Sequence, residues 1–273
     1  MVVITTAAGY LLAAEPFAWM PLIHAALGTL LVASSASALN QVIERRTDAQ
    51  MRRTAGRPIP TGRLGVTEAL IFSVALGIAG MVYLALWVNP LTAALGASTL
   101  ALYVFLYTPL KRHSSLATLV GAIPGAVPPM MGCTAATDRL DPLGWVLFGI
   151  LFLWQMPHFL AIAWLYRSDY ERGGFPLLTL GEAIGGRSAA ERTAQQMMLY
   201  AAALIPVSLL PSVLGLLGWP YLVGALVAGA GFLAASFAFG MAPEARTARR
   251  LLLVSVLYLP VVLGLMVVDR FWL

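Results

Sequence analysis

From Gly65 to Trp87 the chain reads GVTEALIFSVALGIAGMVYLALW, an apolar run in which Glu68 is the one charged residue. A helix needs about 20 apolar residues to cross a bilayer, and this run is long enough. The whole chain of 273 residues is 60% hydrophobic and 11% charged, whereas soluble domains average about 45–50% and about 25%. This composition excludes an ordinary water-soluble globule. The continuous runs also disfavour a transmembrane barrel, whose strands alternate apolar and polar residues.

Charged and Pro/Gly-rich breaks divide the chain into nine such segments, so the sequence predicts an all-α, polytopic membrane protein. The predicted spans are 1–14, 18–38, 65–87, 90–107, 116–136, 143–166, 193–214, 217–240 and 250–270. We expect them to form a single domain over 1–273, around a central cavity open to the cytoplasmic side. The first span lacks a basic region and a cleavage site, so we interpret it as a truncated first helix rather than a signal peptide. The single Cys133 excludes an intramolecular disulfide.

The basic residues predict the orientation of these spans, because Lys and Arg accumulate in cytoplasmic loops. The loops after spans two, four, six and eight carry six, two, four and three of the 17 basic residues, which leaves Arg139 and Arg270 for the opposite face. These loops are therefore predicted to be cytoplasmic, with a cytoplasmic amino terminus and a periplasmic carboxyl terminus. The formal net charge of +5 follows from this topology, and no nucleic-acid partner is expected.

The stretch from Asn40 to Pro58 carries the first concentration of polar side chains. Asn40, Glu44 and Asp48 are spaced four residues apart, which places them on one face of a helix that continues out of the second span. Three oxygen-bearing side chains on one stripe suit a hard cation such as Mg²⁺ together with phosphate oxygens of a substrate. The alternative is an amphipathic helix end in which the acids offset neighbouring arginines. The stretch alone leaves both interpretations open.

A second polar cluster, residues 166–176, follows the sixth span and places Asp169 and Glu171 among arginines. The pair of glycines after it allows backbone amides to approach an anion. Two carboxylate clusters facing one cavity would hold a metal–diphosphate between them, with the arginines on phosphate oxygens. That arrangement is what the ionisation of an allylic diphosphate requires. A solvated loop with a glycine turn is the alternative, and it is favoured for Glu171 and Arg172 taken singly.

Three further features lie on spans four to six. Pro109 is expected to end the fourth helix and to leave Lys111 and Arg112 at the interface, as topology anchors or as ligands of an anion. The Gly/Pro-rich run over 121–132 does not suit a regular lipid-facing helix, so we expect loosened backbone that lines a cavity. His158 follows a proline inside the sixth span, either at a functional interior site or as a packing residue bonded to a carbonyl.

Taken together, these motifs resemble the UbiA superfamily of intramembrane prenyltransferases, and within it the haem O synthase family. The family pattern N-x-x-x-E-x-x-x-D-x-x-M-x-R-T-x-x-R-P is matched at every fixed position from Asn40 to Pro58. Four more stretches agree with the family, namely 107–112, 121–129, 155–159 and 169–177. The resemblance therefore covers nearly the whole chain.

The resemblance implies Mg²⁺-dependent transfer of a farnesyl group from farnesyl diphosphate to the 2-vinyl group of haem b, which gives haem O, in the bacterial cytoplasmic (inner) membrane. It makes Asn40, Glu44, Asp48 and Asp169 the catalytic set that positions the Mg²⁺–diphosphate. The residues that it assigns to substrate binding are Arg52, Arg53, Arg57, Tyr107, Lys111, Arg112, His158 and Tyr170. It also suggests haem A synthase or a terminal oxidase assembly as protein partners, within the lipid bilayer.

Other functions are compatible with parts of the sequence. A superfamily member that prenylates an aromatic acid such as 4-hydroxybenzoate usually has an extra Asp after the first Asn, where this chain has Gln41. A secondary transporter predicts paired broken helices and polar groups near the bilayer centre, whereas the acids here gather at the cytoplasmic surface. A purely structural membrane subunit leaves both carboxylate clusters unexplained.

Overall fold

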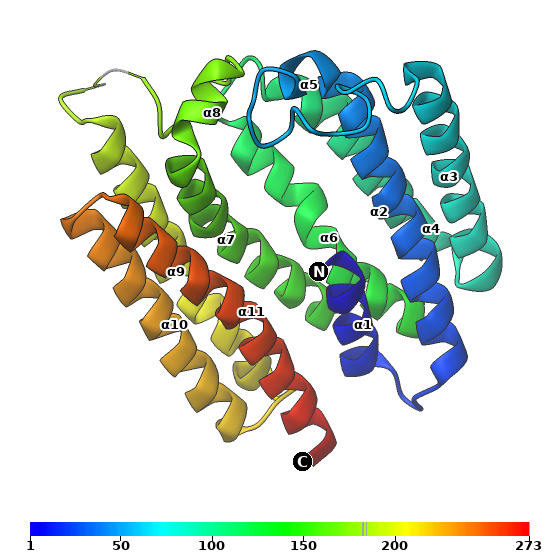
Figure 1. Ribbon diagram of the computed structural model, residues 1–273. Helices are drawn as coiled ribbons and strands as arrows, with labels where there is room; N and C mark the ends of the chain where they lie inside the picture. The colour runs from blue at the N-terminus through cyan, green and yellow to red at the C-terminus, as the bar shows by residue number, and fades with distance from the viewer. Residues whose placement is uncertain (182, 184, 273) are drawn as a thin grey trace. The chain divides into compact units, whose positions relative to one another are not determined.

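The computed structural model describes residues 1–181, 183 and 185–272, which form helices joined by turns and loops with no strand among them (Figure 1). Eight helices of this described part are long and apolar enough to cross a membrane, and α1 (Val2–Ala13) is a shorter apolar helix. The predicted all-α, multi-span architecture is confirmed. The chain divides into two compact units, unit 1 with residues 1–144 and 168–176, and unit 2 with residues 145–167 and those from 177 onward.

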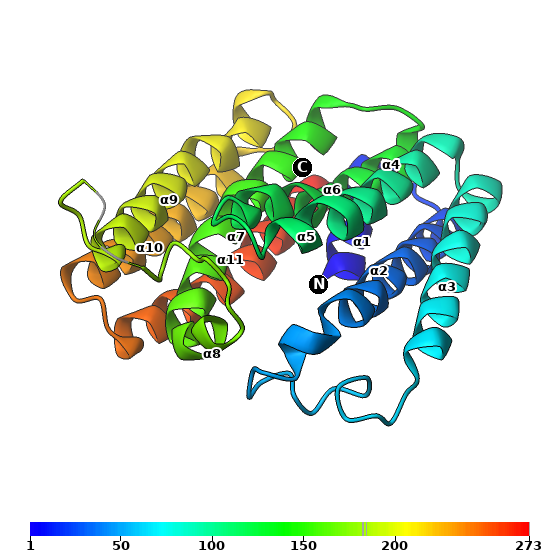
Figure 2. The ribbon, with the colours of Figure 1, turned by 90° about the horizontal axis from the view of Figure 1, so that it is seen from above.

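Unit 1 is a group of closely packed helices. Its elements are α1, α2 (Trp19–Asp48), α3 (Val66–Trp87), α4 (Pro90–Ala101), the π-helix η1 (Leu102–Tyr107), α5 (Thr108–Leu110), α6 (Ala117–Thr137) and most of α8 (Arg167–Arg172). The helices α2 and α3 lie antiparallel and side by side, and α1 packs along α6 (Figure 1). The loop after α2 lies beside α8 at one end of this unit (Figure 2).

Unit 2 contains most of α7 (Pro142–Leu165), together with α9 (Ala189–Val213), α10 (Trp219–Met241) and α11 (Ala245–Trp272). The helix α10 packs against both α9 and α11 (Figure 1). The indole Nε1 of Trp154 donates to the carbonyl oxygen of Ser255 at 2.7 Å and ties α7 to α11. The buried carboxylate of Asp269 accepts from the backbone N–H groups of Gly218 and Tyr221, which satisfies the first turn of α10.

Capping residues decide where several helices begin. The side chain of Asn89 accepts from the Thr92 N–H at 2.7 Å, and Pro90 occupies the first position of α4. Ser188 and Glu191 form a reciprocal capping box that starts α9 at Ala189 rather than at the predicted residue 193. The predicted span began too late because the charged residues of the first turn, Glu191 and Arg192, were assigned to the preceding loop.

Pro109 lies in the last turn of the fourth helix, which ends at Leu110 and leaves Lys111 and Arg112 beyond it as expected. The helix continues past the predicted end at 107 and runs through η1 and α5 to Leu110. Proline has no N–H and crowds the carbonyl four residues earlier, so a regular α-helix is disfavoured at this point. The π-turn provides a different pairing, because the Thr108 N–H bonds to the Tyr103 oxygen five residues earlier.

The expectation of loosened backbone over the Gly/Pro-rich run is wrong. The helix α6 is α-helical from Ala117 to Thr137 although it contains three prolines. The sequence also predicts that this run does not face lipid. That part agrees with the structure, because most residues from Ala122 to Thr134 are buried. Neighbouring helices supply the contacts that stabilise an interrupted hydrogen-bond ladder.

Two glycines allow α1 and α6 to approach at backbone distance. A Cβ added at Gly9 would lie 2.0 Å from the carbonyl oxygen of Pro129, and one added at Gly132 would lie 2.0 Å from that of Thr6. Small residues at such crossings let membrane helices pack closely. Gly9 and Gly132 therefore permit the close packing of α1 against α6 in the core of unit 1.

Candidate functional site

The acidic stripe predicted on the second span lies on the last turns of α2, which runs on to Asp48 as expected. Asn40, Glu44 and Asp48 are all buried, with exposed fractions of 7%, 4% and 1%. Carboxylates are rarely buried unless a partner compensates their charge. The partners of this stripe come from two other segments of unit 1, which rules out a simple amphipathic helix end.

Lys111 compensates the negative charge of Glu44 and also faces Asn40. Its Nζ lies 3.0 Å from Oε1 of Glu44 and 3.4 Å from Oδ1 of Asn40. The Asn40 Nδ2 in turn donates to Oε2 of Glu44 at 2.9 Å. The same ammonium lies 4.5 Å from the ring centre of Tyr107, within range of a cation–π interaction. Lys111 therefore joins a carboxylate, an amide oxygen and an aromatic face.

Asp48 is compensated from the loop that follows α2. Arg57 donates through Nη1 to Oδ2 of Asp48 at 2.7 Å, and the Thr54 hydroxyl donates to the Asp48 backbone oxygen at 2.9 Å. The second carboxylate oxygen, Oδ1, is buried and has no hydrogen-bond partner among the described residues. A buried acceptor without a donor is costly. This oxygen is therefore suited to a cation or to a donor on a ligand.

The second cluster reaches the first through Asp169 on α8. The Arg53 N–H donates to Oδ2 of this buried carboxylate at 3.2 Å, and Arg172 forms an ion pair with Oδ1. Burial by itself would raise the pKa of Asp169, but the hydrogen bonds from the Arg53 backbone and from Arg172 hold the pKa below its ordinary value. Met51 packs against Gly173, where a Cβ would come within 3.2 Å of it. The two predicted polar clusters thus meet in one place.

Aromatic rings flank both sets of charges. The Tyr107 ring lies 5.1 Å from that of Tyr103 and fits over Gly121, where a Cβ would stand 2.4 Å from a ring carbon. The Arg53 guanidinium lies 5.9 Å from the ring centre of Tyr170, which meets Phe175 edge to face. These rings place electron-rich faces close to the cations of the site.

Two more of the predicted cations lie at the surface. Arg112 is exposed and donates through Nη2 to the Thr47 hydroxyl at 2.9 Å, which attaches it to α2. Arg52 is exposed at the start of the loop. Both remain accessible to an anionic group that approaches this end of unit 1.

His158 belongs to unit 2 and is described there by itself. Its Nδ1 lies 2.8 Å from the Ser255 hydroxyl, and its ring stacks on Trp154 with 4.8 Å between centres. These contacts are compatible with the packing alternative for this residue, with a hydroxyl as the partner in place of the carbonyl which that alternative named.

The donor set of the stripe fits magnesium that is shared with a substrate. Among the described residues no three His, Cys, Asp or Glu side chains gather closely enough to hold a metal ion by themselves. Mg²⁺ usually takes only one or two carboxylates and fills its shell with water and phosphate oxygens. The unpartnered Oδ1 of Asp48 and the neighbouring Glu44 provide such a partial set.

Sequence reasoning missed Thr108 and Tyr103, which take part in the site. Thr108 is 1% exposed, and its hydroxyl lies 3.2 Å from Oδ1 of Asn40 and 2.7 Å from the Tyr103 oxygen. A single hydroxyl next to a proline carries no local signal of function. Only the packing of α5 against α2 reveals the role of Thr108.

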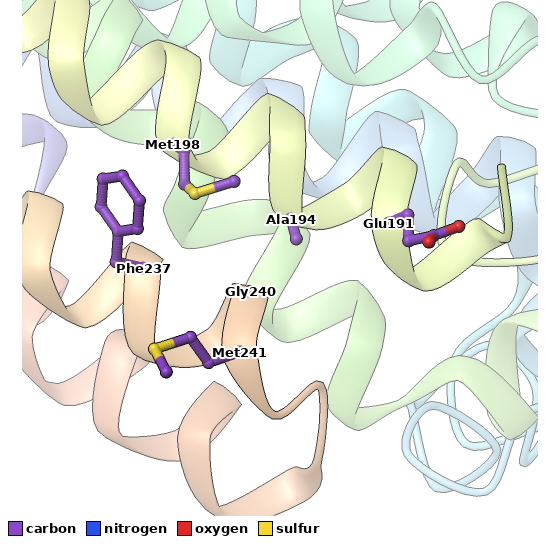
Figure 3. Close-up of a pocket in the computed structure, with 6 residues that line it drawn as sticks. All are labelled: Glu191, Ala194, Met198, Phe237, Gly240 and Met241. Carbon is purple, nitrogen blue, oxygen red and sulfur yellow. The ribbon is translucent and has the colours of Figure 1, made fainter.

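A separate cavity lies in unit 2 between α9 and α10, with a volume of about 310 Å³ (Figure 3). Glu191 stands at one end of it, and Met198 and Phe237 stand at the other (Figure 3). The Glu191 carboxylate is engaged by the N–H and hydroxyl of Ser188. None of the predicted site residues lines this cavity, so the polar cluster of unit 1 is the candidate site.

Comparison with known proteins identifies the family of this chain. The sequence model of the UbiA prenyltransferase family matches residues 2–265. The chain is 51% identical over 249 residues to a protein of Solibacter usitatus named protoheme IX farnesyltransferase, an alignment that covers 91% of this chain and 84% of that protein.

Solved structures show the same fold. A structure described for digeranylgeranylglyceryl phosphate synthase superimposes with a TM-score of 0.83 at 17% identity, over 100% of this chain and 94% of that one. A UbiA homologue from Archaeoglobus fulgidus, bound to DMAPP and Mg²⁺, gives a TM-score of 0.64 at 11% identity, over 99% and 95% of the two chains. Because the family model matches residues 2–265 of this chain and a protoheme IX farnesyltransferase is 51% identical over 91% of it, this multi-pass membrane protein belongs to the UbiA prenyltransferase family.

Proposed function

We propose that this protein transfers a farnesyl group from farnesyl diphosphate to the vinyl group of protoheme IX (haem b) and so forms haem O. The 51% identity to a protoheme IX farnesyltransferase over 91% of the chain supports the choice of both substrates. The observation that carries the chemistry is the buried, cation-paired carboxylate stripe of α2, with one oxygen of Asp48 left for a ligand. No feature of unit 1 calls for an aromatic acid as acceptor instead.

Four residues would hold Mg²⁺ with the diphosphate, namely Asn40, Glu44, Asp48 and Asp169. When bound, the metal would neutralise diphosphate oxygens and so make the diphosphate a better leaving group. Glu44 and Asp48 supply buried oxygens on one helix face. Asp169 is linked to the same region through the Arg53 N–H. The solved structure of a UbiA homologue bound to DMAPP and Mg²⁺ supports the pairing of a prenyl diphosphate with this metal in this fold.

The cations of the site would stabilise the charge that develops on the diphosphate. The allylic C–O bond breaks, and its electron pair leaves with the diphosphate. Lys111 and Arg57 stand beside the carboxylates and can turn to phosphate oxygens, while Arg53, Arg52 and Arg112 supply further positive charge. Charged groups that are already in position before the reaction make the largest contribution to transition-state stabilisation in many enzymes.

The allylic carbocation must then survive until the acceptor attacks. The faces of Tyr107 and Tyr170 lie near the cationic groups of the site and can stabilise a positive carbon in the same way. The vinyl carbon of haem attacks C1 of the farnesyl group, a carbon–carbon bond forms, and the charge passes to the haem side. Water closes the reaction as a hydroxyl group and releases one proton. Exclusion of water before that step prevents simple hydrolysis of the diphosphate.

We also infer the placement of the protein. The basic loops favour the cytoplasmic membrane of a bacterium with the site on the cytoplasmic side, a cytoplasmic amino terminus and a periplasmic carboxyl terminus. The family model matches residues of both units, which supports a single functional domain over 1–273.

We propose His158 as a contact to haem, with its ring held in place by Ser255 and Trp154. Haem A synthase or a terminal oxidase assembly would be the partner that consumes the product.

One assay tests the proposed activity. Membranes that contain the protein are incubated with haem b, farnesyl diphosphate and Mg²⁺, with 4-hydroxybenzoate in parallel, and products are identified by mass spectrometry. We expect haem that has gained a farnesyl and a hydroxyl group, and no prenylated 4-hydroxybenzoate. Prenylation of 4-hydroxybenzoate with haem unchanged would refute the acceptor and leave the family assignment intact. Membranes with the Asp48→Ala variant serve as the negative control.

A further inference from the structure

Thr108 occupies the junction between α2 and the π-turn. Its hydroxyl is buried between two acceptors, Oδ1 of Asn40 at 3.2 Å and the backbone oxygen of Tyr103 at 2.7 Å. A hydroxyl has one hydrogen, so it donates fully to one of these at a time or divides the bond between them. The question is which acceptor depends on it.

The Tyr103 oxygen does not depend on the hydroxyl. It also accepts the backbone N–H of Thr108, which is the bond that closes the π-turn. A buried carbonyl needs at least one donor, and this one keeps it when the hydroxyl turns away. The hydroxyl of Thr108 is therefore free to serve Asn40.

The amide of Asn40 needs a fixed orientation. Its Nδ2 donates to Glu44, while its Oδ1 faces the ammonium of Lys111 at 3.4 Å. The flipped amide would turn its oxygen to a carboxylate and its N–H₂ group to an ammonium, and both contacts would be repulsive. Lys111 and Thr108 are the two donors that hold Oδ1 in place.

We propose that Thr108 is a positioning residue, whose hydroxyl keeps the Asn40 amide, and through it Glu44, in place when Lys111 turns to the diphosphate. This rests on the proposed function, in which Lys111 binds phosphate oxygens. Without Thr108, the departure of Lys111 would leave Oδ1 of Asn40 without a hydrogen-bond donor to orient it for Mg²⁺. Glu44 would then lose the orienting bond from Nδ2 at the moment when the site takes up Mg²⁺ and diphosphate.

The π-turn explains how Thr108 comes to face α2. One extra residue in a helical turn rotates every later side chain by about 100° around the axis. The turn at Leu102–Tyr107 is the irregularity that precedes Pro109, and Thr108 is the first residue after it. The same rotation directs Lys111 to Glu44, so one backbone feature sets both donors of Asn40.

Thr108→Val and Thr108→Ser separate the hydroxyl from the shape of the side chain. Valine keeps the branched shape and removes the hydroxyl, whereas serine keeps the hydroxyl. Thr99→Val is the matched control, because the Thr99 hydroxyl also donates to a backbone oxygen of the same helix, that of Leu95 at 2.8 Å, without touching the site. Should Thr108→Val not insert, Thr108→Ala carries the same expectation.

The primary measurement needs no turnover. Thermal unfolding of the purified full chain is followed with inorganic pyrophosphate at increasing Mg²⁺, and the Mg²⁺ concentration at half of the maximal rise in Tm is recorded. We expect Thr108→Val to raise this concentration about tenfold, the size expected from one hydrogen bond, and Thr108→Ser to stay within about twofold of wild type. Thr99→Val should leave it unchanged. The Mg²⁺ dependence of farnesylated haem formation should shift in parallel.

The outcomes separate this proposal from the proposed function. A Thr108→Val protein with a lower Tm but a wild-type response to Mg²⁺ would show that Thr108 is only structural. A tenfold increase of the half-maximal Mg²⁺ concentration in Thr108→Ser would exclude loss of the hydroxyl as the cause. If wild type forms no farnesylated haem while the pyrophosphate response shifts as expected, Thr108 is supported and the assigned reaction is refuted. In an Asn40→Ala background, Thr108→Val should produce no further shift.

Discussion

Lys111 and Glu44 form an ion pair of 3.0 Å although they lie 67 residues apart, one just after α5 and the other near the end of α2. The pair is mostly buried, with exposed side-chain fractions of 19% and 6%. Loss of one partner would leave a charge that is only partly solvated, which is more destabilising than loss of both. The stability of unit 1 and the chemistry of the site therefore depend on the same contact.

Lys111→Met should lower both stability and activity. We expect a loss of about 1–3 kcal/mol, because partial exposure reduces the penalty for the unpaired carboxylate. The double variant Lys111→Met with Glu44→Gln should recover much of the Tm and none of the product formation. Thermal unfolding in detergent and the haem assay measure the two effects. Arg139→Met, at an exposed arginine of the opposite predicted face, is the control, and equal losses in both variants would contradict a specific role.

Asp48→Asn should reduce product formation about 100-fold or more, since it weakens the contact to Mg²⁺–diphosphate and removes the charge that Arg57 balances. The protein should still insert, because asparagine has nearly the same shape. The assay is farnesylated haem per unit of folded protein. Asp138→Asn, at an exposed residue with positive φ that asparagine accommodates, should retain full activity. Activity within tenfold of wild type in Asp48→Asn would rule out the assigned role.

The contact of Asp169 with the loop after α2 should depend on pH. The pKa of Asp169 in the folded chain is held below its ordinary value of 3.8 by the Arg53 N–H and by Arg172, against the effect of burial. A depressed pKa contributes stability above the unfolded value, and this contribution is lost as the pH falls through the folded value. The difference in Tm between wild type and Asp169→Asn should thus be constant above about pH 5 and shrink below about pH 4. A difference in Tm that increases as the pH falls would contradict a lowered pKa of Asp169 in the folded chain.

Gly132→Ala should strongly destabilise unit 1. The added Cβ would lie 2.0 Å from the Thr6 oxygen, and backbone on the opposite helix cannot move aside as a side chain can. We expect a loss of about 3 kcal/mol, at the upper end of the usual cost of overpacking. Gly264→Ala in α11 is the matched control, because nothing lies within 4 Å of its added Cβ. That variant should be neutral or gain up to about 1 kcal/mol from helix propensity.

Much of the fold follows from the sequence because membrane spans are local. A run of apolar residues is visible without knowledge of its neighbours, and the predicted span 65–87 becomes α3 at Val66–Trp87. The i, i+4, i+8 spacing of Asn40, Glu44 and Asp48 is also enough to predict that they share one face of a helix, whereas their burial is seen only in the structure.

The partners of that stripe could not be predicted, because they depend on the packing of distant segments. Nothing near Lys111 in the sequence points to Glu44, and nothing near Met51 points to Gly173. The π-turn before Pro109 is hidden for a related reason. A proline in sequence indicates a break, and only the surrounding helices decide whether the chain ends or rearranges there.

The pairing of Lys111 with Glu44 and of Arg57 with Asp48 bears on how the reaction finishes. Lys111 and Arg57, two of the cations that would bind the diphosphate, each have an acidic partner within the chain. In the proposed reaction these carboxylates would compete with the inorganic product for the same two cations and so lower its affinity. In the proposed reaction this competition would favour release of the inorganic product over tight binding.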